Sequence, residues 1–161
     1  MDILLVGLVL ELFGVLSPIQ KEYVQRVDGH YNEMVSDYQV SQGWRLDIPS
    51  LGMSEQMDEV SIEGKTIPVP EDKPGVLVGE NGLFIVGHTP GVFSRLAEMP
   101  DEVIVRQNGA SSSYRLYSYE ESRVEDIKMS RVLGFNGVAI MTCSGEMVGG
   151  KMSHRLILYY K

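Results

Sequence analysis

The chain has 161 residues, a length that suits one domain with a buried core. Hydrophobic residues make up 43% of it and charged residues 22%, which argues against a disordered chain. The net charge of −8 and the fourteen scattered basic residues argue against a nucleic-acid partner, because phosphate binding needs clustered Lys and Arg. The single cysteine, Cys143, excludes an internal disulfide and a cysteine-rich zinc site. This thiol is therefore either a small buried side chain or a reactive group.

The first 42 residues have a helical pattern. Residues 3–16 are apolar except for Glu11, but a helix that spans a bilayer needs about 20 apolar residues. The run also lacks the basic residues that open a signal peptide. It is either an amphipathic or core helix or the remnant of a membrane anchor. Ser17 and Pro18 then predict a helix start, and we expect residues 1–42 to be helical and peripheral.

The pattern changes to strands at Trp44. Leu46 and Ile48 alternate with polar residues up to Pro49, which confines this run to a sheet edge or a strand end. The proline-rich stretch that follows predicts a connection. Residues 83–87 are continuously apolar and predict a short strand that is buried on both faces.

The rest of the chain predicts two hairpin strands, a helical turn and two final strands. Asn108-Gly109, the dipeptide most favoured in a tight hairpin turn, separates two of the strand patterns. Thr89 and Pro90 predict one or two helical turns that begin after the buried strand and stop at Pro100. At least six strands without a βαβ alternation indicate a mostly antiparallel barrel or sandwich behind an N-terminal helical arm.

Three reactive side chains stand beside these predicted strands. His88 follows one apolar run, Cys143 follows another, and Arg155 opens the last one. A thiol attacks as its thiolate, and an imidazole can move protons near neutral pH. A guanidinium is always charged and can stabilise a developing oxyanion. Together the three residue types predict acyl transfer through a thioester.

Each of these residues also has a purely structural explanation. His88 suits a turn, Cys143 could pack at the rim of a barrel, and Arg155 could pair with any of 22 acidic residues. His154 would point to the opposite face of its strand from Arg155, so it is a poor candidate for the same site. Only the joint occurrence of the three favours chemistry.

At these residues the sequence resembles the sortases, cysteine transpeptidases of the bacterial cell surface. The resemblance covers roughly residues 44–161. It rests on three stretches, which read LDIPSLGM from residue 46, LFIVGHTPGVFSRLAEM from residue 83, and IMTCSG from residue 140 followed by HRLILYY from residue 154.

The resemblance implies a closed β-barrel of about eight strands with short helices, occupying residues 43–161. It implies Cys143 as the nucleophile, His88 as the general acid and base, and Arg155 as the oxyanion or substrate-positioning group. Thr142 is similar to the family's threonine that helps to line the oxyanion pocket, which makes it a candidate substrate-binding residue. The implied reaction cleaves an LPxTG-like sorting signal through a thioacyl enzyme and passes the acyl group to an amine of a cell-wall precursor or a pilin lysine. No cofactor or metal site is expected.

The resemblance further implies surface proteins with a C-terminal sorting signal as partners. It implies a membrane location, with residues 1–42 as a possible truncated anchor and the catalytic domain outside the cytoplasm. Glu11 counts against that anchor, because a carboxylate in hydrocarbon costs roughly 2–3 kcal/mol. Two alternatives remain, a cysteine peptidase that only hydrolyses and a non-catalytic surface barrel with a structural cysteine. Residues 144–154 predict either a glycine-bearing loop that closes over a peptide or a plain connection.

Overall fold

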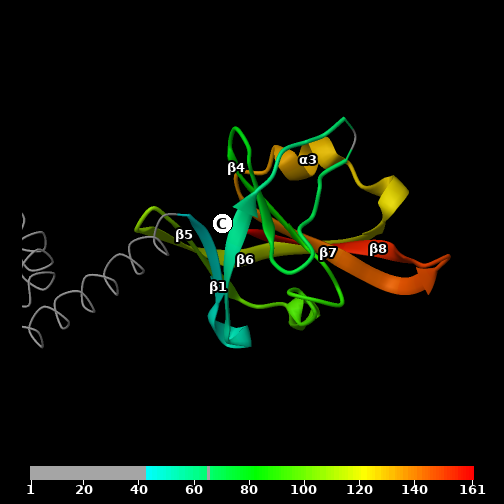
Figure 1. The fold of residues 1–161 in the computed structure, drawn as a ribbon, viewed down its shortest axis with the longest axis horizontal. Helices are drawn as coiled ribbons and strands as arrows, with labels where there is room; N and C mark the ends of the chain where they lie inside the picture. Colours follow the sequence, from blue (N-terminus) through cyan, green and yellow to red (C-terminus); the bar gives the residue numbers. More distant parts are fainter. Residues whose placement is uncertain (1–42, 65) are drawn as a thin grey trace, which may run out of the picture. The chain divides into compact units, whose positions relative to one another are not determined.

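The computed structural model describes residues 43–64 and 66–161, which form a closed eight-stranded barrel (Figure 1). The strands are β1 (Trp44–Ile48), β2 (Met53–Glu59), β3 (Gly75–Val78), β4 (Gly82–Gly87), β5 (Glu102–Gln107), β6 (Ala110–Arg123), β7 (Gly137–Val148) and β8 (Lys151–Tyr160). Around the barrel they follow the order β1-β2-β3-β4-β7-β8-β6-β5. The predicted fold class is confirmed. The predicted helical arm and anchor, residues 1–42, lie outside the described residues. No helix among those described is long and apolar enough to cross a membrane.

The first two strands form as their alternation predicts. Leu46 and Ile48 point into the barrel and are fully buried. Pro49 ends β1 and opens the short 3-10 helix η1 (Pro49–Leu51). Gly52 then takes a φ of 62°, a left-handed conformation that suits glycine, and Ile48 pairs with Met53 across the turn. A proline at this point therefore ends a strand and helps to start the reversal.

The hairpin of β5 and β6 turns at the predicted dipeptide. Asn108 and Gly109 have φ values of 49° and 81°, the pair of positive angles that a two-residue hairpin turn of the right twist requires. Gln107 and Ala110 are the first pair of residues beyond the turn. β6 then runs to Arg123, further than its apolar pattern predicts, because it leaves β5 and continues along β8.

The buried strand β4 lies parallel to β7, with Leu83 opposite Val138 and Gly87 opposite Thr142. Its residues from Phe84 to Gly87 are all buried, as the continuous apolar run predicts. The inner side faces the barrel, and the outer side is covered by the connection between β6 and β7 and by part of the proline-rich segment. That connection contains η3 (Val124–Asp126) and the short helix α3 (Met129–Leu133).

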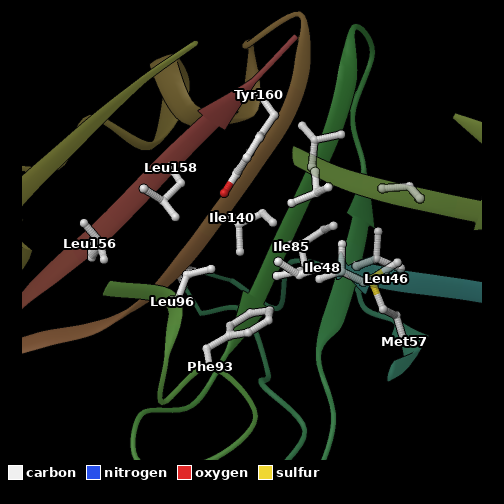
Figure 2. Close-up of a cluster of buried hydrophobic side chains, with 14 residues drawn as sticks. Leu46, Ile48, Met57, Ile85, Phe93, Leu96, Ile140, Leu156, Leu158 and Tyr160 are labelled. Carbon is white, nitrogen blue, oxygen red and sulfur yellow. The ribbon is translucent and has the colours of Figure 1, made fainter. Parts of the chain in front are cut away.

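Two hydrophobic clusters hold the barrel together. The inner cluster includes alternate residues of β8, namely Leu156, Leu158 and Tyr160, whose side chains lie along one side of the strand in Figure 2. Phe93 and Leu96, from the segment after β4, pack against the same cluster. The outer cluster takes the intervening residues of three neighbouring strands, and its buried members are Phe84, Val86, Val132, Ala139, Ile157 and Tyr159. The cluster to which a buried residue of β4, β7 or β8 belongs shows whether it lies on the inner or the outer face of the barrel.

Candidate active site

The strands that carry Cys143 and Arg155 extend beyond both residues, contrary to the prediction that these residues mark a strand end and a strand start. β7 continues to Val148 and β8 begins at Lys151. Gly149 and Gly150, with φ values of 58° and 80°, make the two-residue turn between the strands. Residues 144–154 therefore form a β-hairpin, the plain connection of the two predicted alternatives. The pairing is irregular only between Ser144 and Met147, where Gly145 has a φ of 78°.

Cys143 and Arg155 are directly opposite each other in the antiparallel pair of β7 and β8. Residues in such positions have Cβ atoms about 4.5–5.5 Å apart and side chains on the same face. Both residues are partly buried, and the thiol is free. The spacing of twelve residues between Cys143 and Arg155 is therefore the spacing of two residues that face each other across a hairpin.

His88 joins this pair from the other side of β7. Gly87 is the last residue of β4 and is paired in parallel with Thr142. The next residue along each chain is His88 on one side and Cys143 on the other. Adjacent strands are about 4.8 Å apart, so the backbone at His88 lies beside the backbone at Cys143. The candidate site thus lies at the end of β4, beside the part of β7 that extends beyond that strand.

Side-chain alternation assigns Cys143 and Arg155 to the outer face of the barrel, and His88 follows the strand β4, which ends at Gly87. Val86, Ala139 and Ile157 belong to the outer cluster on β4, β7 and β8. His88 lies two residues after the first, Cys143 four after the second, and Arg155 two before the third. Even spacings along a strand keep one face. The structure therefore places Cys143 and Arg155 on one face of two neighbouring strands, with His88 as the first residue after the adjoining strand β4.

Thr142 belongs to the opposite, inner face and is 4% exposed. Its hydroxyl donates a hydrogen bond to the carbonyl of Gly87 at 2.9 Å and lies 2.6 Å from the hydroxyl of Thr89. Thr89 was predicted to cap a helix that starts at Pro90. Instead, its hydroxyl contacts Thr142 and the carbonyl of Phe93, and the only helix in this segment is the 3-10 helix η2 (Leu96–Glu98). The sequence signal for this contact, the Gly-His-Thr-Pro run, was interpreted as a helix start.

The segment after His88 packs tightly under the end of β4. A Cβ atom added to Gly87 would lie 2.5 Å from the ring of Phe93, so the buried aromatic ring needs glycine at that position. The amide of Phe93 donates to the carbonyl of His88 at 3.2 Å. The backbone on both sides of the imidazole is therefore fixed by buried contacts.

The guanidinium of Arg155 is bonded only to backbone in the described part of the chain. Its Nη1 donates to the carbonyls of Met152, at 3.1 Å, and His154, at 2.8 Å. No carboxylate of residues 43–64 or 66–161 forms an ion pair with it. Bonds to neutral carbonyls leave the positive charge of the guanidinium uncompensated.

His154 lies on the inner face, as predicted from its position next to Arg155. It is opposite Ser144 on β7, and its Nδ1 is 2.7 Å from the hydroxyl of Ser153. Within the described residues, no three His, Cys, Asp or Glu side chains gather in the arrangement that a metal ion needs.

A cavity of about 200 Å³ lies at the same end of the barrel, between η1, the start of β2 and residues 92–96. Its walls include Leu51, Met53, Glu55 and Phe93, but none of the three candidate catalytic residues. The cavity is therefore separate from the site described above.

No protein-family model matches the sequence, and no curated protein matches it. Solved structures do match. Sortase A from Corynebacterium diphtheriae superposes with a TM-score of 0.57 at 16% identity, covering 74% of this chain and 59% of that one. The chain has the sortase fold. Sortase C1 from Streptococcus agalactiae superposes with a TM-score of 0.58 at 17% identity. The match covers 75% of this chain and 66% of the sortase C1 chain.

Sortase C-1 from Actinomyces oris agrees as well, with a TM-score of 0.55 at 19% identity over 73% of this chain and 71% of that one. The chain spans about three-fifths to two-thirds of the length of the Corynebacterium and Streptococcus sortases. At these identities the likeness establishes the sortase fold, and the chemistry has to be argued from the residues.

Proposed function

We propose that the protein is a sortase-type cysteine transpeptidase, with Cys143, His88 and Arg155 as its catalytic residues. One observation carries the proposal. In the register of β4, β7 and β8, Cys143 is paired with Arg155 on one side and lies one residue beyond the pair of Thr142 with Gly87 on the other, where His88 follows β4. A nucleophile, a proton carrier and a fixed positive charge are the groups that acyl transfer needs.

In the first step, His88 takes the thiol proton and the sulfur of Cys143 attacks the carbonyl carbon of a peptide bond. The carbonyl oxygen becomes an oxyanion, which the guanidinium of Arg155 stabilises by charge and hydrogen bonding. The C–N bond then breaks, and the leaving amine takes the proton from the imidazole. The products of this step are a thioester on Cys143 and the released C-terminal peptide.

In the second step, an amine replaces the thiol. Its nitrogen attacks the thioester carbonyl, His88 accepts its proton, and the thiolate leaves and regains a proton from the imidazole. We propose an LPxTG-like sorting signal as the substrate, surface proteins that carry it as partners, and a cell-wall precursor or pilin lysine as the acceptor. The similarity to solved sortases supports this substrate class.

We also propose that Thr142 contributes to the pocket that holds the substrate. Its side chain is buried, so a contact with substrate would come from its backbone. We further propose a location at the bacterial cell surface, which the sortase likeness supports, and residues 1–42 as the attachment to the membrane.

The test is incubation of the protein with a peptide that contains an LPxTG signal, with and without triglycine as an amine acceptor. Mass spectrometry would show the N-terminal fragment joined to triglycine if the protein is a transpeptidase. A free carboxylate in both samples would indicate a hydrolysing cysteine peptidase. No cleavage by the wild type across related sorting peptides would favour the non-catalytic barrel, and Cys143→Ala is the control for a contaminating protease.

A further inference from the structure

Two threonines that are not among the three proposed catalytic residues connect the segment of His88 with the strand of Cys143. Thr142 is the residue before Cys143, and Thr89 is the residue after His88. Their hydroxyl oxygens are 2.6 Å apart, the distance of a strong hydrogen bond. This is a contact between side chains 53 positions apart in the chain, made at the place where β4 stops beside β7.

The direction of this hydrogen bond follows from counting protons. Each threonine hydroxyl has one proton to donate. Thr142 donates its proton to the carbonyl of Gly87 at 2.9 Å, and a carbonyl can only accept. The proton between the two hydroxyls therefore belongs to Thr89. The contact of Thr89 with the carbonyl of Phe93, at 3.3 Å, is the longer and weaker one.

Both neighbours of His88 are consequently hydrogen-bonded to the hydroxyl of Thr142. Gly87 is held through its carbonyl and Thr89 through its hydroxyl. The carbonyl of His88 itself accepts from the amide of Phe93. The backbone that carries the imidazole has little freedom to rotate away from Cys143 while these three bonds are made.

We propose that Thr89 is a positioning residue for the reaction, and that its hydroxyl holds His88 beside Cys143 by hydrogen bonding to Thr142. This inference rests on the proposed function. Thr89 touches neither substrate nor the reacting atoms, so it acts through the imidazole. A displacement of about 1 Å at a catalytic group can lower a rate about 100-fold.

The experiment compares Thr89→Val, which keeps the shape and removes the hydroxyl, with Thr89→Ser, which keeps the hydroxyl. Thr66→Val is the matched control, because Thr66 is exposed and only its backbone is bonded, to Glu63. We expect Thr89→Val to lower kcat about 10- to 100-fold and to leave KM within about twofold. Thr89→Ser should keep at least half of the wild-type kcat, and Thr66→Val should match the wild type.

A second measurement separates positioning from loss of folding. The rate of Cys143 alkylation by iodoacetamide, followed against pH without any substrate, should shift in Thr89→Val toward the profile of His88→Ala. A variant that is only less stable would keep the wild-type profile at temperatures below its melting point. Should Thr89→Val fail to fold, Thr89→Ala removes the same hydroxyl with less risk of a steric clash.

The double variant Thr89→Val/Thr142→Val tests whether the two hydroxyls act as one unit. In that case the losses are not additive, and the double variant is hardly worse than the poorer single one. A normal kcat and a normal alkylation profile in Thr89→Val would overturn the inference while the proposed function stands. A wild-type alkylation profile that is indifferent to His88→Ala would overturn both.

Discussion

Cys143 and Arg155 face each other across an unbroken part of the β7–β8 ladder, which pairs residue by residue from Val138 with Tyr160 to Ser144 with His154. A slip by one residue would move every side chain of one strand to the other face. The inner face carries Ile140, Leu156 and other fully or largely buried side chains, so such a slip would expose the core. The core of the barrel therefore fixes the pairing of the two residues that carry the thiol and the guanidinium.

Replacement of Arg155 by lysine should impair the reaction nearly as much as replacement by alanine. Lysine keeps the charge but loses the planar fork, and its ammonium cannot bond two backbone carbonyls and an oxyanion in the same geometry. We expect kcat to fall at least about tenfold in both variants. Steady-state kinetics on a sorting peptide would measure it, with Arg123→Lys, an exposed arginine on β6, as control. A fully active Arg155→Lys variant would show that charge alone is sufficient.

Gly87→Ala should destabilise the barrel and disturb the site together. The added methyl group would lie 2.5 Å from the ring of Phe93, and overpacking of this kind costs about 1–3 kcal/mol. Urea denaturation would measure the loss. Gly43→Ala is the control, because a Cβ atom there meets nothing within 4 Å. Equal stability of the two variants would contradict the packing described here.

The barrel should become less stable in acid as the carboxylate of Asp47 is protonated. Burial by itself raises the pKa of Asp47, but hydrogen bonds from Ser54 and Arg106, with the charges of Arg106 and Arg45, outweigh it and hold this pKa below its ordinary value. A lowered folded-state pKa gives stability that is present above the unfolded pKa, about 3.9, and is lost as the pH falls through the folded value. Asp47→Asn should therefore be less stable than the wild type at pH 7.

The same variant should approach the wild type in stability as the pH falls below about 4. Denaturation curves from pH 7 to pH 2.5 would show the difference shrinking. A difference that stays constant over this range would mean that Asp47 contributes by packing rather than by its charge.

The contribution of Tyr160 to the stability of the barrel should have the opposite pH dependence, with a loss in alkali instead of acid. Its hydroxyl donates to the carbonyl of Pro100 at 3.1 Å, and burial, with the nearby charge of Asp101, raises its pKa. A raised folded-state pKa gives stability that is complete below the unfolded pKa, about 10, and is lost as the pH rises above it. Tyr160→Phe should cost ~1 kcal/mol at pH 8 and lose less stability than the wild type between pH 10 and pH 11.5. Equal alkaline losses in both proteins would contradict this account of Tyr160.

The alternating and turn-forming residues predicted much of the barrel. Leu46 and Ile48 define the inner face of β1, and Asn108-Gly109 defines a hairpin, because these signals are local. The parallel pairing of β4 with β7 has no local signal, since the two strands are about 50 residues apart in the chain. The length of the β7–β8 hairpin was also missed, because its polar outer half lacks the apolar pattern that marks a half-buried strand.

The three candidate catalytic residues could be chosen from the sequence because their chemistry and their positions beside apolar strands are both visible there. The contact of Thr89 with Thr142 could not be predicted in this way. A threonine before a proline is equally suited to a helix start, and its actual partner is 53 positions away. The local signal predicts helical turns, of which the structure has the 3-10 helix η2, but the hydrogen-bond partner of Thr89 is set by the parallel register.

The rate of Cys143 alkylation by iodoacetamide, measured between pH 5 and pH 9 in the wild type and in His88→Ala, tests the catalytic arrangement most directly. Because this chain has only one cysteine, the rate reports on that thiol alone. We predict a reactive wild-type thiol whose pH profile of alkylation changes when the imidazole is removed. Identical profiles in two folded proteins, or a thiol that resists alkylation up to pH 9, would contradict it.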